Sequence, residues 1–130
     1  MTKEIIRTGE KWEGQMSFSQ GVKSGPLIFV SGQGALDDDG NVVGKGDIQA
    51  QTRKALSNLQ KVLKNGGASL SDVVKVTTFI TNRGPGMIKA YDTVFGQFFP
   101  TACPASTLVE VKSLVLKDMM VEIEAIAVLP

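Results

Sequence analysis

The chain has 130 residues, of which 42% are hydrophobic and 21% are charged, as expected for one globular domain that spans residues 1–130. Its formal net charge is +1 and it has no dense run of lysine and arginine, which argues against a nucleic-acid-binding protein. Histidine is absent, which excludes Ser/His/Asp and Cys/His catalytic groups and zinc sites that contain histidine.

The cysteine content and the apolar runs bear on the compartment. Cys103 is the only cysteine, so no disulfide can form within the chain, and a reducing compartment is expected. The opening residues lack the long apolar stretch of a secretory signal, and no run approaches the ~20 apolar residues of a membrane helix. We therefore expect a cytoplasmic protein that does not enter membranes.

Short β-favouring runs dominate the first part of the chain. Residues 18–23 form a weak candidate strand, which ends at a Ser-Gly-Pro turn. Residues 27–30 form a stronger one, which ends at the Ser-Gly-Gln-Gly of residues 31–34. Asp39-Gly40 suits the tight turn of a hairpin, which predicts paired strands at 34–36 and 41–43.

The clearest helix covers residues 47–65. Its apolar residues recur at spacings of three and four, Asp47 is a plausible N-cap, and Gly66-Gly67 supplies the stop. Residues 73–80 are rich in β-branched residues and predict a strand. A second helix is predicted over 87–99, ended by Pro100, and two strands at 107–111 and 119–128 close the chain.

This order of elements predicts an α+β fold in which two helices pack on one face of a sheet. A chain of this size has no further elements to cover the other face, so oligomerisation is expected. In the last strand, Glu122 and Glu124 share a face with Ile126 and Val128. A polar, partly wet subunit interface would accommodate both kinds of side chain, and an exposed edge with scattered apolar residues is the alternative.

Two motif-like segments do not fit the chemistry that they suggest. In residues 37–41 the glycine comes one place too early for a calcium loop, and Ile48 stands where the bidentate glutamate should be. Gly32-Gln33-Gly34 is not directly followed by a helix, and the chain contains no GK[ST] motif, so a phosphate loop is not indicated. We expect no metal site and no nucleotide site.

Four separated segments resemble the RidA/YjgF family. Residues 18–22 (FSQGV) and 27–33 (LIFVSGQ) are similar to its YSQAV…LLFVSGQ opening, and residues 46–53 (GDIQAQTR) to its GDIEAQTR helix start. Residues 67–77 (GASLSDVVKVT) resemble its GASLDDVVKTT stretch, and KD at 117–118 with VEIEAIAV at 121–128 resembles its ending. The resemblance runs from residue 18 to residue 128 without large gaps.

The resemblance implies a chorismate-mutase-like fold and a homotrimer. In that family the sheets form an inner barrel with the helices outside, and clefts for small carboxylate or imine ligands lie between subunits. The family's reaction hydrolyses enamines and imines such as 2-aminoacrylate to a keto acid and ammonia, and it needs no cofactor. An arginine holds the substrate carboxylate bidentately, and a glutamate handles the attacking water.

The family's site residues carry over only in part. Glu122 matches the water-handling glutamate, and Ser31, Gly32 and Gln33 match the motif at the end of the strand. The arginine of the family's PARS/T motif falls on Ser106, which is followed by Thr107.

Three further family positions are changed to apolar residues. The usual tyrosine falls on Phe18, a frequent asparagine on Ile88, and a frequent cysteine on Leu108. The expected site is therefore more apolar and less cationic than the family's. Lys112 is the nearest cation on the predicted strand of Ser106, and the alternation of a strand places both on one face.

Two interpretations of function follow from the resemblance. One is a deaminase of the same chemistry with a substrate other than 2-aminoacrylate, in which Glu122 is the base and Ser106 and Thr107 hydrogen-bond the substrate. The other is a non-catalytic trimer that binds metabolites. Purely structural roles also remain open, because Glu122 can bridge subunits and Ser31 can simply end a strand.

Overall fold

The computed structural model describes residues 2–82 and 84–130. The elements in chain order are β1 (Lys3–Ile6), β2 (Gly21–Ser24), β3 (Leu27–Gln33), α1 (Ile48–Asn65), a 3₁₀ turn η1 (Leu70–Asp72), β4 (Val73–Ile80), α2 (Met87–Phe98), β5 (Ala105–Glu110) and β6 (Val121–Val128). Within these residues, no helix is long and apolar enough to cross a membrane.

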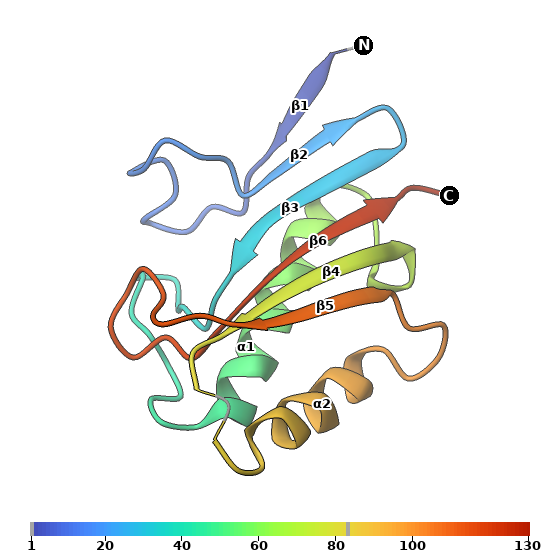
Figure 1. Ribbon diagram of the computed structural model, residues 1–130. Coiled ribbons are helices and arrows are strands. Elements are labelled where there is room, and N and C mark those ends of the chain that lie inside the picture. Colours follow the sequence, from blue (N-terminus) through green and yellow to red (C-terminus); the bar gives the residue numbers. More distant parts are fainter. Residues whose placement is uncertain (1, 83) are drawn as a thin grey trace.

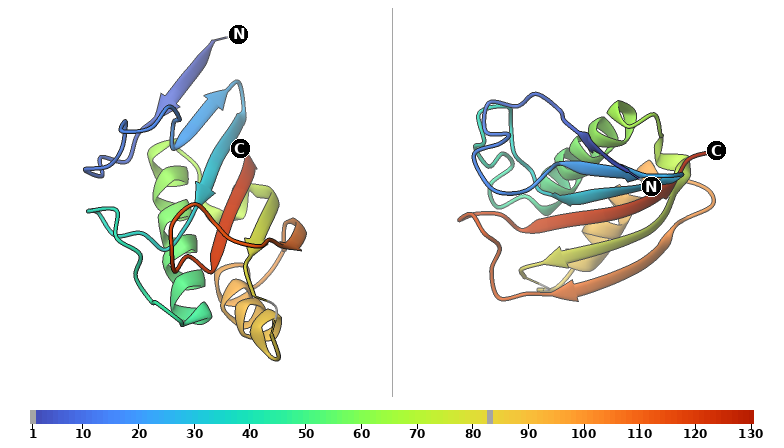
Figure 2. Two further views of the ribbon diagram at one scale, coloured as in Figure 1. Left: turned by 60° about the vertical axis from the view of Figure 1, so that its left-hand side comes forward. Right: turned by 90° about the horizontal axis from the view of Figure 1, so that it is seen from above.

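The strands form one mixed six-stranded sheet in the order β1-β2-β3-β6-β4-β5. All neighbours pair antiparallel except β4 and β5, which are parallel and are connected through α2, as a parallel pair requires. Figures 1 and 2 place both helices on one face of the sheet, which leaves the other face open. This is the α+β arrangement that the sequence predicted.

Helix α1 confirms the predicted helix and its cap. The Asp47 carboxylate accepts a hydrogen bond from the backbone N–H of Ala50, and the chain leaves the helix at Gly66. The buried face of the helix packs on the sheet and includes Gln51, a polar residue that the apolar pattern did not mark. The buried residues of α1 are Ile48, Gln51, Thr52, Ala55, Leu56, Leu59, Val62 and Leu63.

Three details near the N-terminus differ from the prediction. Strand β1 was not predicted, and β2 begins only at Gly21 rather than at residue 18. The turn at residues 39–40 exists, but the expected hairpin is reduced to a single bridge between Leu36 and Val42. The Asp37 carboxylate accepts the backbone N–H groups of Asp39 and Asn41, which closes a compact loop in place of a ladder.

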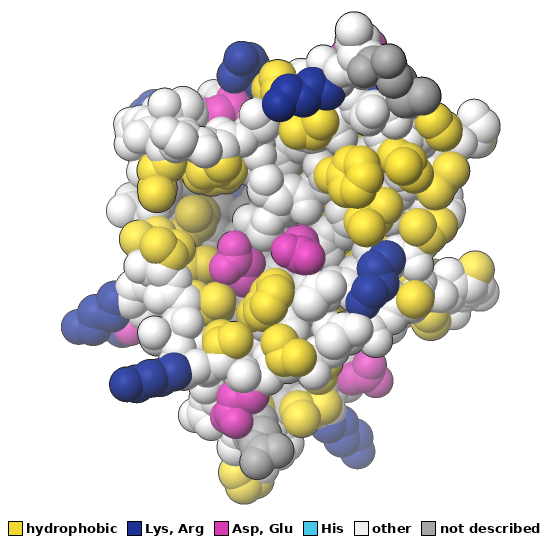
Figure 3. All heavy atoms as spheres, turned by 45° about the horizontal axis from the view of Figure 1, so that its top comes forward, with side chains coloured by type: hydrophobic (Ala, Val, Ile, Leu, Met, Phe, Trp, Pro, Cys, Tyr) yellow, Lys and Arg dark blue, Asp and Glu magenta, His cyan; other side chains and the backbone are white. Residues whose placement is uncertain are grey.

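The open face carries apolar rows that run across the strands. By register, Ile5, Val22, Phe29 and Ile126 are successive neighbours on β1, β2, β3 and β6. Phe29 is 43% exposed although it lies on an inner strand. In Figure 3 hydrophobic side chains gather around acidic ones on the visible face. An exposed apolar sheet face of this kind is typical of an interaction surface.

Candidate functional site

A hollow of about 270 Å³ lies where β3 ends and β6 begins. We call it the Glu122 hollow. Its lining is Trp12, Gln15, Met16, Phe18, Gly32, Gln33, Gly34, Leu36, Gly40, Asn58, Val115, Leu116, Met119 and Glu122. Four of the residues expected from the family motif therefore lie together in one hollow: Phe18, Gly32, Gln33 and Glu122.

Glu122 projects from β6 into this hollow, and Gly32 makes room for it. A Cβ atom at position 32 would lie 2.1 Å from Oε1 of Glu122 and 2.7 Å from its Cδ. Only a glycine lets the carboxylate lie so close to the β3 backbone. The pairing of β3 with β6 shifts register between Val30 and Gln33, so Gly32 lies within an irregularity of the strand pair and lines the hollow.

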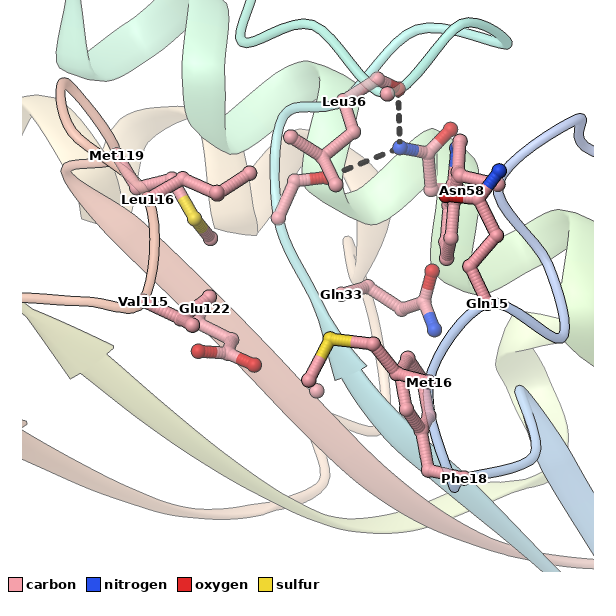
Figure 4. Close-up of a pocket in the computed structure, with 14 residues that line it drawn as sticks. Gln15, Met16, Phe18, Gln33, Leu36, Asn58, Val115, Leu116, Met119 and Glu122 are labelled. Carbon is pink, nitrogen blue, oxygen red and sulfur yellow. Dashed lines mark hydrogen bonds between the residues drawn. The ribbon is translucent and has the colours of Figure 1, made fainter.

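The carboxylate of Glu122 lies in an apolar environment. It is half-buried, and in Figure 4 it points into the hollow near Val115 and Met16. Among the described residues, none forms a hydrogen bond or an ion pair with it. Burial, and next the charge of Glu124, raises the pKa of Glu122 above its ordinary value. A half-buried carboxyl group with a raised pKa is suited to accept and return protons.

The polar amides of the hollow are already hydrogen-bonded within the chain. The side-chain nitrogen of Asn58 donates to the carbonyls of Gly34 (2.9 Å) and Leu36 (3.0 Å). The side-chain nitrogen of Gln33 donates to Oε1 of Gln20 (2.8 Å) and to the carbonyl of Ser31 (3.1 Å). An amide nitrogen carries two hydrogens, so neither nitrogen has a free donor for a ligand.

One wall of the hollow comes from the segment between β1 and β2. Trp12 docks on the loop after β3, because its indole N–H donates to the carbonyl of Asp37 at 3.2 Å. The Ser31 hydroxyl donates to the carbonyl of Ser19 at 2.5 Å. This hydrogen bond connects the segment between β1 and β2 to β3, so the Ser31 side chain has a structural role. It is not among the residues that line the hollow.

The opposite wall is the loop before β6, and Gln51 of α1 holds it. Gln51 is fully buried, donates to the carbonyls of Asp118 (2.8 Å) and Gly44 (3.3 Å), and accepts the N–H of Met120 at 2.8 Å. Apart from Phe18, sequence reasoning missed the residues of both walls, because these walls belong to irregular segments. The one available signal was a glutamine on the apolar face of a predicted helix.

The other expected residues lie elsewhere. Ser106, Leu108 and Ile88 line a second, more open hollow between β5 and α2, which we call the Ser106 hollow. Ile88 is 46% exposed there. The remaining lining residues are Lys89, Tyr91, Asp92, Phe95, Gly96, Cys103 and Pro104.

The two hollows open on different faces of the sheet. Ser106 pairs with the buried Val76 of β4 and so faces the helices, whereas Glu122 pairs with Phe79 and faces the open side. Within one protomer the expected site is therefore split.

Two expectations about β5 need qualification. Thr107 points to the face opposite Ser106, where it accepts a hydrogen bond from Lys75 Nζ at 2.7 Å. The strand ends at Glu110, so Lys112 lies outside the strand that was expected to place it on one face with Ser106, and that prediction was wrong. Lys112 lines another hollow, with Thr81 and Asn82. The lysine in the Ser106 hollow is Lys89.

Comparisons with known proteins agree with the fold. A family model described as Endoribonuclease L-PSP matches residues 9–129. A RutC family protein of Pyrococcus abyssi is 38% identical over 127 residues, covering 98% of each chain. The chloroplastic Reactive Intermediate Deaminase A of Arabidopsis thaliana is 31% identical, and the match covers 98% of this chain and 66% of the plant protein. The crystal structure of E. coli TdcF with bound serine is 33% identical, has a TM-score of 0.86, and is matched over 98% of this chain and 99% of that chain.

Proposed function

The chain belongs to the RidA/YjgF family, and on that premise we propose that it hydrolyses small enamines or imines, with Glu122 as the general base and with a substrate other than 2-aminoacrylate. The observation that carries the proposal is the Glu122 carboxylate itself, half-buried in an apolar hollow with a raised pKa. One relative named as a reactive-intermediate deaminase supports the same reaction class.

The proposed reaction uses Glu122 twice. The carboxylate takes a proton from water while the water oxygen bonds to the imine carbon. The protonated carboxyl then returns the proton to the nitrogen of the carbinolamine. As the C–N bond breaks and the carbonyl forms, Glu122 takes the remaining hydroxyl proton and passes it to the departing ammonia. A group with this double duty works best with a pKa near the working pH, and burial moves the pKa of Glu122 upward in that direction.

The proposal places the reaction at a cleft between subunits of a homotrimer. Ser106 and Glu122 lie on opposite faces of the sheet, so a single protomer cannot bring both to one ligand. The Glu122 hollow of one protomer would meet the Ser106 hollow of its neighbour. The exposed apolar rows of the open face support an assembly that covers them.

The second candidate function is non-catalytic binding of a metabolite by the same trimer. Ser106 favours it, because the family's substrate-holding arginine is replaced by a short neutral side chain. The hollow would then retain a ligand without turnover.

Substitution of Glu122 tests the two functions against each other. Imines are generated in place by amino-acid and amine oxidases, and carbonyl product is followed with wild type, Glu122→Gln and the control Glu124→Gln. Glu124 lies on the same face of β6 but does not line the hollow. We expect Glu122→Gln to lose about 10²–10⁴-fold in rate and Glu124→Gln to keep most of it. Equal rates for wild type and Glu122→Gln would remove Glu122 from the mechanism, and ligand binding without turnover by wild type would favour the second function.

We also propose that the protein resides in the cytoplasm. The single cysteine supports this location. Fractionation of the source cells, followed by detection with a specific antibody, tests it.

A further inference from the structure

We infer that the Glu122 hollow selects imines that are apolar and carry no carboxylate, the kind that oxidation of an amine supplies, rather than the imine of an amino acid. The inference rests on the proposed deaminase function and specifies its substrate. Three features of the hollow support it: its charge, its hydrogen-bond donors and its walls.

The charge of the hollow is negative only. Among its described lining residues, Glu122 is the single charged side chain, and neither lysine nor arginine is present. Glu124 lies close enough for its charge to raise the pKa of Glu122. A substrate carboxylate would add another negative charge beside this pair, whereas a protonated imine nitrogen would be attracted by it.

The hollow also offers few side-chain donors that could hold a carboxylate. Both hydrogens of the Asn58 amide and both of the Gln33 amide are donated within the chain. The Gln15 amide gives one of its two hydrogens to the carbonyl of Lys11 and keeps only one. A carboxylate that enters such a site loses bound water and finds few side-chain donors to replace it, and this penalises anionic substrates.

The walls suit a compact hydrocarbon group. The apolar side chains come from the segment between β1 and β2, from the loop after β3 and from the loop before β6; they are Trp12, Met16, Phe18, Leu36, Val115, Leu116 and Met119. In Figure 4 the labelled members of this set surround the space in front of the Glu122 carboxylate. A volume of about 270 Å³ accommodates a small molecule with one ring or a short branched chain.

The Ser106 hollow, which would face the substrate from the neighbouring subunit, does not reverse this balance. Its cation is Lys89, and Asp92, one turn further along α2, lines the same hollow. The two formal charges cancel. Ser106 and Leu108 add a neutral hydroxyl and an apolar side chain.

The reaction on such a substrate balances without any co-reactant beyond water. The iminium R₂C=NH₂⁺ and water give R₂C=O and NH₄⁺. Glu122 accepts a proton from water as the C–O bond forms and returns it to the nitrogen of the resulting carbinolamine. As the C–N bond breaks, Glu122 takes the remaining hydroxyl proton and passes it to the departing ammonia, which leaves as NH₄⁺. The apolar wall would place the carbon group away from the carboxylate, so that the iminium end lies next to Glu122.

Matched pairs of imines test the inference. Phenylalanine and 2-phenylethylamine, and leucine and 3-methylbutylamine, give imines that differ within each pair only by the carboxylate. Oxidases generate them in the presence of catalase, and the carbonyl product is followed with the buffer rate subtracted. We expect kcat/KM to be at least about tenfold higher for the carboxylate-free member. A preference for the carboxylate-bearing member would overturn the selectivity and leave the deaminase function standing, and no acceleration of any imine would overturn both.

A charge-restoring variant provides the second arm. Ser106→Arg places a guanidinium where the family has one, and it should raise kcat/KM for the carboxylate-bearing imines relative to their partners by about 10–100-fold. The control is Ser57→Arg, the same change on the exposed side of α1 and outside both hollows. Both proteins are compared at equal oligomeric mass. An unchanged preference in Ser106→Arg would show that the lack of a cation does not determine the selectivity and would overturn the inference.

Discussion

The contact between Gly32 and Glu122 allows the position of the proposed base to be changed without altering the base itself. In Gly32→Ala the new Cβ atom would lie 2.1 Å from Oε1, 2.7 Å from Cδ and 2.9 Å from Cγ of Glu122. Real Cβ contacts are essentially never shorter than 3.0 Å, so the carboxylate must retreat. The side chain is flexible and faces a hollow, so it can move without unfolding the sheet.

The size of the effect follows from this displacement. The gap between 2.1 Å and 3.0 Å requires the carboxylate to shift by about 1 Å. A misplacement of about 1 Å at a reacting group costs on the order of 10²-fold in rate. We therefore expect kcat/KM on an accepted imine to fall on the order of a hundredfold, while the thermal midpoint changes by only a few degrees.

The assay compares Gly32→Ala with Gly21→Ala in β2. At position 21 a Cβ atom would meet the core side chains of Val62 (2.8 Å) and Ile6 (3.3 Å), so this control should lose stability and keep its activity per folded molecule. Turnover, circular dichroism and oligomeric mass are measured for both. Wild-type turnover by a folded Gly32→Ala protein would refute the reasoning that the backbone at residue 32 positions Glu122.

Five further outcomes are expected. Burial raises the pKa of Glu122, so the folded state holds the carboxyl proton more tightly than the unfolded chain does. The free energy of unfolding should therefore decline as the pH rises from about 4.5 through the folded pKa. Urea titrations at several pH values should show this decline in wild type and not in Glu122→Gln. The same shift should move the acidic limb of kcat/KM above pH 4.5, and Glu124→Gln should move it back towards that value. Light scattering coupled to size exclusion at micromolar concentration should give the mass of a trimer, and a clean monomer mass would contradict the site between subunits. Activity on 2-aminoacrylate should be on the order of a hundredfold lower than that of an arginine-bearing relative, because a bidentate charged contact worth roughly 1.5–3 kcal/mol is absent. Equal rates of the two proteins in a coupled assay would contradict this. Gln51→Leu should lower the free energy of unfolding by about 2–6 kcal/mol, because it leaves the N–H of Met120 and the carbonyl of Asp118 without their hydrogen-bond partner. A change below about 1 kcal/mol would show that water replaces the amide.

Local patterns in the sequence were sufficient for the regular elements. The limits of α1 and β4 were predicted to within a residue, because a capped amphipathic helix and a β-branched run each carry a strong signal over neighbouring residues. The alternation in β6 likewise placed Glu122 and Glu124 on one face. By contrast, β1 has four residues and gains its pairing from β2, so nothing in its own sequence marks it.

The sequence by itself determined the family, the α+β elements and the face of β6 on which the proposed base lies. The tertiary structure alone decided that Gly32 lies beneath Glu122, that Ser31 and Gln51 hold the two walls of the hollow, and that Ser106 faces away from Glu122. The physical reason is that these contacts join residues far apart in the chain. They depend on strand order, register and the irregularity in β3, none of which leaves a periodic trace in the sequence.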